Sequence, residues 1–222
     1  MADLKDTRDP KTIIAARIAS ELKDGDVVNL GIGLPEQVAN NLPEGVELVL
    51  QSENGIMGMG PAAEGGKENV DIVNAGAKYV TVNPGAMFFD SATSFGFIRG
   101  GHVDATVLGA MEVDENANIA NWIIPGKMVP GMGGAMDLVV GAKKVIVGMI
   151  HTQKGAPKIL KQCTLPLTAV GVVSEIVTEM CVFEFIDGKL TLTELHPDHT
   201  VEEVTAATAA GFAVADDLKP MI

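Results

Sequence analysis

Hydrophobic positions along this chain fall into two kinds of segment that alternate. In one kind, apolar residues recur every three or four positions, a spacing that predicts amphipathic helices. In the other, several apolar residues follow one another without a break, which is typical of strands buried inside a sheet. This alternation favours an α/β fold, with a mostly parallel open sheet flanked by helices. The expected order is helix 10–23, strand 27–32, short helix 35–42, strand 46–51, strand 79–82, helix 91–98, strand 105–108, apolar segment 119–124, a helix from 135, strand 145–150 and helix 201–210.

Residues at two of the predicted helix starts support these boundaries. Asp9 is followed by Pro10, and this pair is typical of a helix start because Asp caps free backbone N–H groups and proline fits the first helical position. Thr200 and Glu203 have the spacing of a capping box, in which each side chain accepts a hydrogen bond from the other residue's backbone N–H. We therefore expect one helix to open at Pro10 and another after Thr200.

The C-terminal part of the chain contains a hairpin signal. Asp187-Gly188 separates the apolar runs 182–186 and 190–192, and such a pair favours a two-residue turn between antiparallel strands. We therefore expect a small antiparallel hairpin beside the parallel sheet. No repeat, low-complexity stretch or linker interrupts the pattern, so a single domain over residues 1–222 is expected.

Composition narrows the class of protein. The chain is 47% hydrophobic but only 4% aromatic, so its core must consist mainly of aliphatic side chains and Met, which suits a buried parallel sheet. No apolar run approaches the roughly 20 residues that a membrane helix needs. The N-terminal segment is polar and lacks a signal-peptide pattern. These features predict a cytoplasmic protein without a membrane partner.

The net charge of −13 makes nucleic acid an unsuitable partner, because binding to a phosphate backbone depends on Lys and Arg. Only Arg8, Arg17 and Arg99 carry a guanidinium group. An anionic ligand would therefore need backbone N–H groups, or another chain, to balance its charge.

Glu53 lies just after the predicted strand 46–51, in a stretch that also contains Gly55, Gly58 and Gly60. In an open α/β sheet, ligands bind at the carboxyl ends of the strands, and glycines there allow a substrate to approach the backbone. A carboxylate at that place could act as a general base, a metal ligand or a nucleophile. A metal is disfavoured because no Asp or His lies nearby at ligand spacing. A glutamate in a turn more often pairs with a lysine or a helix N-terminus, so its position alone leaves the role open.

Five stretches of the chain resemble, in the same order, sequence patterns of the family I (3-oxoacid) CoA-transferases. The most specific runs from Leu50 to Gly58 and is similar to the signature around the family's catalytic glutamate, with Glu53 at that position. Met57 departs from this pattern, in which a branched aliphatic residue or Phe is usual; the side-chain shape changes but the chemistry does not. The other stretches are 29–35, 94–95 with 98–102, 120–122 with 125–128, and 131–138.

This resemblance implies a fold that is related to that of sugar-phosphate isomerases and deaminases. It implies ping-pong transfer of CoA between carboxylic acids, with Glu53 as the nucleophile. Glu53 would form a mixed anhydride with the acyl group and then a glutamyl-CoA thioester. CoA is a substrate in this scheme, so no cofactor and no metal are expected.

Each acyl transfer passes through an oxyanion that needs hydrogen-bond donors. Gly133, Gly134 and Ala135 lie where a glycine-rich loop opens a predicted helix, whose dipole favours negative charge, although the loop alone could simply be a tight helix start. Further candidates for contacting CoA or positioning the glutamate are Gly31, Gly33, Asn29 and Asn54. Either asparagine could instead bond to nearby backbone. Gly31 and Gly33 do not begin a dinucleotide-binding motif, because Glu36 stands where its third glycine would be.

The matched patterns belong to the B half of these enzymes, and no pattern of the A half is present. The resemblance therefore implies that this chain is a B-type CoA-transferase subunit and that a second chain, the A-type CoA-transferase subunit, carries the other half. It also implies an α2β2 heterotetramer with its active site at the interface between the two kinds of chain. The expected ligands are acyl-CoA and short-chain carboxylates.

The acid pair is expected to be acetate or butyrate with acetoacetate. The succinyl-CoA:3-oxoacid branch has Lys directly after an Asn-Ala-Gly run, whereas here Asn74-Ala75-Gly76 is followed by Ala77 and then Lys78. The B-type chain of a succinyl-CoA:3-oxoacid or 3-oxoadipate CoA-transferase is the alternative. More distant alternatives are an enzyme like the sugar-phosphate isomerases and deaminases, and a non-catalytic protein that binds acyl-CoA.

Overall fold

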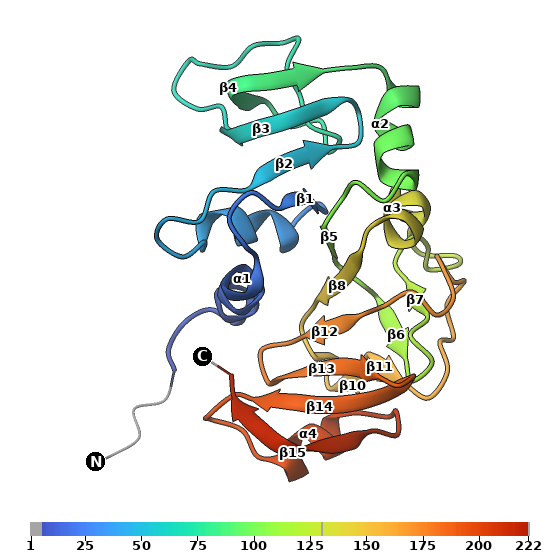
Figure 1. Ribbon diagram of the computed structural model, residues 1–222. Helices are drawn as coiled ribbons and strands as arrows, with labels where there is room; N and C mark the ends of the chain where they lie inside the picture. Colours follow the sequence, from blue (N-terminus) through green and yellow to red (C-terminus); the bar gives the residue numbers. More distant parts are fainter. Residues whose placement is uncertain (1–5, 130, 222) are drawn as a thin grey trace.

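The computed structural model describes residues 6–129 and 131–221, and one ten-stranded sheet runs through the molecule (Figure 1). In spatial order its strands are β15 (Ala213–Pro220), β14 (Lys189–Leu195), β13 (Cys181–Ile186), β12 (Glu175–Val177), β8 (Lys144–Gly148), β5 (Ala105–Leu108), β1 (Val27–Leu30), β2 (Val49–Ser52), β3 (Ile56–Ala62) and β4 (Val80–Phe88). From β12 to β2 all neighbours are parallel. Antiparallel strands flank this centre on both sides, since β3 and β4 continue from β2, and β13 and β14 from β12. The expected α/β fold with a mostly parallel sheet is confirmed.

Smaller elements complete the fold. Two short strand groups lie outside the large sheet: β6 (Glu112–Asp114), β7 (Ile119–Ala120) and β11 (Ile159–Leu160) in one, β9 (Thr152–Gln153) and β10 (Ala156–Pro157) in the other. The helices are α1 (Pro10–Glu21), the 3₁₀ helix η1 (Pro35–Asn40), α2 (Ser91–Arg99), α3 (Ala135–Gly141) and α4 (Val201–Ala207). In the described part of the chain, none of these helices has the length and apolar content required to cross a bilayer.

The central strands are buried on both faces, and the two faces have different partners. Ile14 and Ile18 of α1 share one apolar cluster with Val28 of β1 and Val107 of β5. Helices α2 and α3 pack together at the opposite face, where Val139 of α3 meets Leu108 and Val145. Because side chains alternate along a strand, the residue after Val28 points toward α2 and α3. That residue is Asn29, a polar side chain within an otherwise apolar strand.

The predicted helix starts and the predicted hairpin are present. Asp9 caps α1 by accepting a hydrogen bond from the Lys11 N–H, and Thr200 and Glu203 form the reciprocal capping box of α4. Asp187 and Gly188 both have positive φ, as the expected two-residue turn requires, and they join β13 to β14.

The prediction was wrong where glycine or polar residues form strands. The glycine-rich stretch after Glu53 was expected to be a turn open to substrate; Gly55 does lie in a turn, but Gly58 and Gly60 lie in strand β3. Its glycines serve strand packing, since a Cβ on Gly60 would lie 2.5 Å from the Thr81 Oγ1 of β4. The polar edge strand β15 was missed, and of the apolar segment 119–124 only Ile119–Ala120 is a strand.

Three predicted helices are shorter than expected, and α1 ends at Glu21. The segment from Pro35 forms a 3₁₀ helix that ends at Asn40, and α4 ends at Ala207. The N–H groups of Ala209 and Ala210 donate to the carbonyl of Ile159 in β11, so tertiary hydrogen bonds replace the last helical turn.

A partly buried cluster of five charged side chains joins α1 to the sheet. It consists of Arg17, Glu21, Lys144, Glu175 and Glu194. Arg17 Nε lies 2.6 Å from Glu194 Oε2, and Lys144 Nζ lies 2.6 Å from Glu175 Oε2. Glu175 is only 1% exposed, and its burial, together with the nearby Glu21 carboxylate, raises its pKa to about 7. Two cations thus face three carboxylates, and Glu175 is the most deeply buried of the three.

We expect Glu175→Gln to flatten the dependence of stability on pH. A carboxyl whose pKa is higher in the folded state stabilises the fold below its unfolded pKa of about 4.5, and that stabilisation is lost as pH rises through about 7. The loss from pH 5 to pH 8 can reach about 3 kcal/mol in the free energy of unfolding, and it should be absent from the variant. Urea unfolding at pH 5, 6, 7 and 8 measures it.

Glu194→Gln is the matched control, because it removes a carboxylate of the same cluster that Arg17 needs. It should lower the free energy of unfolding by about 2 kcal/mol at every pH in that range. If the free energy of unfolding of Glu175→Gln fell from pH 5 to pH 8 as steeply as that of the unmodified chain, Glu175 would not be the source of the pH dependence, contrary to this prediction.

Candidate functional site

Glu53 lies in the tight turn that joins β2 to β3, directly beyond the carboxyl end of β2. The Gly55 N–H donates to the Ser52 carbonyl over 2.9 Å and closes the turn, and the Gly55 carbonyl accepts from the Phe89 N–H over 3.0 Å. Gly55 has a φ of +118°, and a Cβ there would lie 2.0 Å from the Phe89 carbonyl oxygen. Only glycine can therefore hold this turn against the end of β4.

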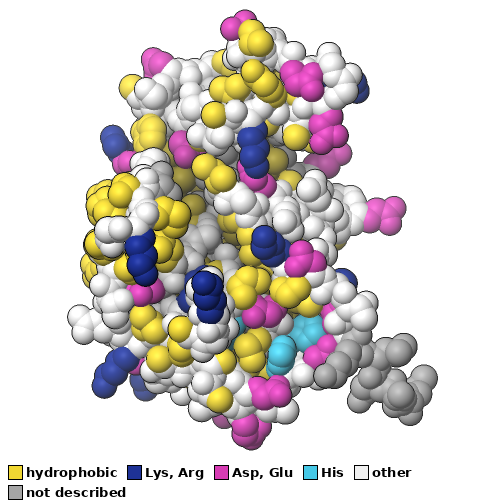
Figure 2. Space-filling view, turned by 180° about the vertical axis from the view of Figure 1, so that it is seen from behind, with side chains coloured by type: hydrophobic (Ala, Val, Ile, Leu, Met, Phe, Trp, Pro, Cys, Tyr) yellow, Lys and Arg dark blue, Asp and Glu magenta, His cyan; other side chains and the backbone are white. Residues whose placement is uncertain are grey.

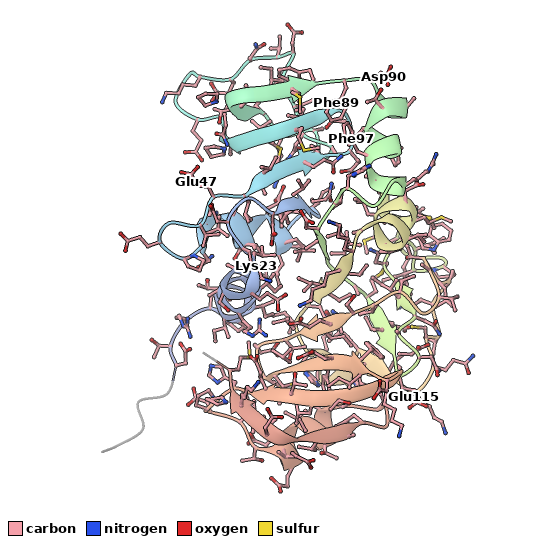
Figure 3. The ribbon with its side chains drawn as sticks, in the orientation of Figure 1. Lys23, Glu47, Phe89, Asp90, Phe97 and Glu115 are labelled. Carbon is pink, nitrogen blue, oxygen red and sulfur yellow. The ribbon has the colours of Figure 1, made fainter. Side chains whose placement is uncertain are left out.

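The junction between β4 and α2 fixes the other side of the turn. Asp90 caps α2 by accepting from the Thr93 N–H over 2.7 Å, and the rings of Phe89 and Phe97 lie 5.4 Å apart between centroids. Figure 3 shows Phe89, Asp90 and Phe97 together where β4 leads into α2. Helix α2 is thereby anchored beside the glutamate turn.

Helix α3 brings the glycine-rich loop to Glu53. Gly134 caps this helix, and a Cβ there would lie 3.1 Å from Glu53 Cγ and 3.3 Å from the Phe95 ring. Arg99 and Asp137 tie α2 to α3 through an ion pair of 2.7 Å. The absence of a side chain at position 134 thus lets the start of α3 pack directly against the glutamate.

A cavity of about 500 Å³ opens at this place, and most of the predicted site residues line it. The lining includes Glu53, Asn29, Gly31, Gly133, Gly134 and Ala135. These residues come from segments more than 100 positions apart, and the carboxyl ends of β1 and β2 bring them together with the start of α3.

Two of the predicted site residues do not line the cavity. The Gly33 N–H donates to Glu36 Oε2 over 3.1 Å, and Asn54 Nδ2 donates to the Val73 carbonyl over 2.7 Å. Asn54 therefore bonds to backbone, the alternative that its residue type left open.

The backbone N–H groups at the start of α3 differ in what they bind. The Ala135 N–H donates to the Met132 carbonyl over 3.0 Å, so it is engaged within its own turn. The N–H groups of Gly133 and Gly134 have no acceptor among residues 6–129 and 131–221. Both residues line the cavity, so their N–H groups are available to a ligand.

Asn29 fixes one oxygen of the Glu53 carboxylate from the protein interior. Its Nδ2 lies 3.1 Å from Glu53 Oε2, while Glu53 Oε1 has no hydrogen-bond partner among the described residues. Asn29 is 2% exposed, so its amide acts from inside the protein. One carboxylate oxygen is thus fixed and the other is available to a ligand.

Sequence reasoning missed two polar residues behind this arrangement. Gln51 accepts a hydrogen bond from Asn29 and donates one to Ser94 of α2. The period of two along β2 offered a signal for Gln51, because it precedes Glu53 by two positions and faces the same side. Ser94 carried no such signal, since its role depends on how α2 packs on the sheet.

Lys78 forms an ion pair with a residue that lines the same cavity. Lys78 Nζ pairs with Glu36 Oε2 at 2.5 Å, and Glu36 lines the cavity. The lysine charge is therefore already balanced within the chain. Elsewhere in the described chain, no three His, Cys, Asp or Glu side chains converge as a metal site would require.

Known proteins resemble this chain along most of its length. A family model described as Coenzyme A transferase matches residues 11–207. The chain is 58% identical over 211 residues to the beta chain of the acetate CoA-transferase of Escherichia coli (strain K12), covering 95% of this chain and 96% of that protein. It is 53% identical over 203 residues to the B-type chain of a probable succinyl-CoA:3-ketoacid coenzyme A transferase of Bacillus subtilis (strain 168), covering 91% and 94% of the two.

A solved structure shows the same fold in a longer chain. The acyl-CoA transferase YdiF of Escherichia coli O157:H7, as apoenzyme, matches with a TM-score of 0.77 at 22% identity. The match covers 99% of this chain and 44% of the other, so this chain spans less than half of that protein.

Proposed function

As this chain belongs to the coenzyme A transferase family, as a B-type subunit, we propose that Glu53 transfers CoA between two short-chain carboxylic acids through a glutamyl-CoA thioester. The observation that carries the proposal is the difference in hydrogen bonding between the two oxygens of the Glu53 carboxylate. One oxygen accepts from the buried Asn29 amide, and the other has no partner among the described residues and belongs to a cavity-lining side chain. A nucleophile needs this combination of fixed orientation and an available lone pair.

The exchange is balanced without any net proton transfer. Glu53 Oε1 attacks the thioester carbon of the acyl-CoA, the C–S bond breaks, and CoA leaves as a thiolate. The thiolate then attacks Glu53 Cδ, the bond from Cδ to the acylated oxygen breaks, and the first acid leaves as a carboxylate. The second acid reverses both steps, releasing its acyl-CoA and restoring the Glu53 carboxylate.

Each attack places negative charge on an oxygen, and the site offers donors for it. When the thiolate attacks Glu53 Cδ, the charge develops on Oε2, to which Asn29 Nδ2 already donates. When Oε1 attacks the acyl carbon, the N–H groups of Gly133 and Gly134 are the nearest candidates, because Gly134 packs against Glu53. Losing one such donor typically costs ~10²–10³ in rate.

The proposed acids are acetate or butyrate and acetoacetate. A second carboxylate, as in succinate, would need a free cation, but Lys78 is already paired with Glu36, which lines the cavity. The 58% identical relative is named as part of an acetate CoA-transferase, and the 53% identical one as part of a probable succinyl-CoA:3-ketoacid transferase. The second name keeps the succinyl-CoA:3-oxoacid pair as the alternative.

The proposed partner is an A-type CoA-transferase subunit, in an α2β2 heterotetramer. Relatives of this length are named as subunits, and the longer YdiF chain contains more than twice this length. Exposed apolar side chains surround α3, namely Met128, Val129, Met136 and Val140. Figure 2 shows hydrophobic side chains gathered on the side of the molecule where α3 lies. A partner there would cover these side chains and could supply the cations that CoA phosphates need.

An intact-mass experiment tests the proposal. The chain is mixed with acetoacetyl-CoA in the presence of its A-type partner, and the mass of both proteins is measured with and without hydroxylamine. We expect a CoA-sized adduct on this chain, located on Glu53 by peptide mapping and removed by hydroxylamine. Exchange without an adduct would contradict the thioester, and acyl-CoA binding without exchange would indicate a non-catalytic protein.

A further inference from the structure

We propose that Gln51 and Ser94 are positioning residues that hold the Asn29 amide against Glu53. Gln51 Nε2 donates to Ser94 Oγ over 3.0 Å, and Asn29 Nδ2 donates to Gln51 Oε1 over 2.7 Å. The same Asn29 nitrogen lies 3.1 Å from Glu53 Oε2. A line of hydrogen bonds therefore runs from α2 through β2 and β1 to the carboxylate. The inference rests on the proposed function and extends it to residues that do not contact the substrate.

The register of the sheet places these side chains in one row. Gln51 of β2 is the partner of Asn29 in β1, and Asn29 is the partner of Thr106 in β5. Neighbouring partners in parallel strands point to the same face, which here is the face covered by α2 and α3. Gln51 is 1% exposed and Ser94 is fully buried, so water does not compete for their hydrogen bonds.

The chemistry of the line fixes its direction. A carboxylate only accepts hydrogen bonds, so Asn29 must present its nitrogen to Glu53. That nitrogen carries two hydrogens but has three acceptors in reach, Gln51 Oε1, the Gln51 carbonyl and Glu53 Oε2. Gln51 must in turn present its oxygen to Asn29 and its nitrogen to Ser94. Each amide then has one arrangement that satisfies its neighbours.

Nothing else among the described contacts would restore this order if Ser94 lost its hydroxyl. Gln51 Nε2 would then be buried without an acceptor, an unfavourable state that favours rotation of the amide. Thr106 Oγ1, which is buried and has no hydrogen-bond partner in the described chain, lies in the same row and offers the Asn29 amide an alternative acceptor. Asn29 would thus turn away from Glu53, although no atom of the cavity had been removed.

Steady-state kinetics of the complex with the A-type partner provide the test. Ser94→Ala and Gln51→Leu should each lower kcat about tenfold to a hundredfold, while KM for acyl-CoA changes less than about threefold, because a nucleophile displaced by a fraction of an ångström still binds substrate. Ser91→Ala is the matched control, since Ser91 is an exposed serine of the same helix, and its kcat should equal that of the unmodified chain.

A double-mutant cycle separates positioning from general support of the fold. In an Asn29→Ala background, Ser94→Ala should have no further effect on kcat, since the line acts through Asn29. Unchanged kcat in Ser94→Ala, or an equal loss in both backgrounds, would overturn the proposal.

A crystal structure of Ser94→Ala decides the inference independently of activity. We expect the distance from Asn29 Nδ2 to Glu53 Oε2 to exceed 3.5 Å in that variant, beyond the reach of a hydrogen bond. An unchanged distance would overturn the positioning role. If the unmodified complex exchanged no CoA but the amide still moved, the proposed function would fail while the positioning line would stand.

Discussion

Replacing Glu53 by glutamine is expected to lower kcat for CoA exchange by about 10⁴-fold or more. The neutral amide lacks the charged oxygen that attacks the thioester. It also cannot be regenerated as a carboxylate at the end of the cycle. The substitution keeps the size of the side chain and its contact with Gly134, so the free energy of unfolding should change little. Exchange between acetoacetyl-CoA and labelled acetate, measured on the complex with the A-type partner, gives the rate.

Two further variants separate the loss of the nucleophile from misplacement of the charge and from a general effect of the Glu→Gln change. Glu53→Asp keeps the charge but withdraws it by one methylene, so a loss of about 10²-fold is expected from misplacement alone. Glu47→Gln makes the same chemical change in the exposed loop ahead of β2, where Glu47 is labelled in Figure 3, and should leave kcat unaltered. Substantial exchange by Glu53→Gln would show that another group forms the covalent intermediate.

Gly55→Ala is expected to lower the free energy of unfolding by about 4 kcal/mol or more. The new Cβ would lie 2.0 Å from the Phe89 carbonyl oxygen, and a φ of +118° is one that L side chains rarely adopt. The Phe89 N–H also donates to the Gly55 carbonyl, so relief of the clash would break this link between the glutamate turn and α2. Thermal unfolding should show a drop in Tm of ~10 °C or more.

Gly45→Ala separates the two causes. Gly45 has a φ of +81° but nothing within 4 Å of its Cβ position, so this variant tests backbone conformation without a clash. It should cost about 1–2 kcal/mol. Equal losses in both variants would mean that the Phe89 contact contributes nothing, and that the turn can move away from β4 freely.

The local pattern of the chain was sufficient for several elements. Asp9-Pro10 and Thr200 with Glu203 start helices through contacts within four residues, and Asp187-Gly188 turns the chain by its own backbone preference. The alternation of apolar strands and amphipathic helices likewise specified an α/β sheet. These features were predictable because each depends on residues close together in the sequence.

Strands made of glycine and polar residues were not predictable in this way. Gly58 and Gly60 weaken a strand when judged by propensity, yet β3 forms because it pairs with β4, whose atoms occupy the space that side chains at these positions would need. β15 carries Asp216 and Asp217 at an edge of the sheet, where both side chains are exposed. In both cases a neighbouring strand, distant in sequence, supplied the stabilising hydrogen bonds.

The sequence by itself determined that Glu53 follows a strand, that a glycine-rich loop precedes a helix, and that the chain resembles one family of transferases. Only the tertiary structure decided which residues meet. It placed Gly134 against Glu53, engaged the Ala135 N–H within its own turn, and directed Asn54 to the backbone of Val73. It also set Gln51 and Ser94 behind Asn29. A hydrogen bond depends on distance and direction in space, and these follow from sheet register and helix packing rather than from neighbours along the chain.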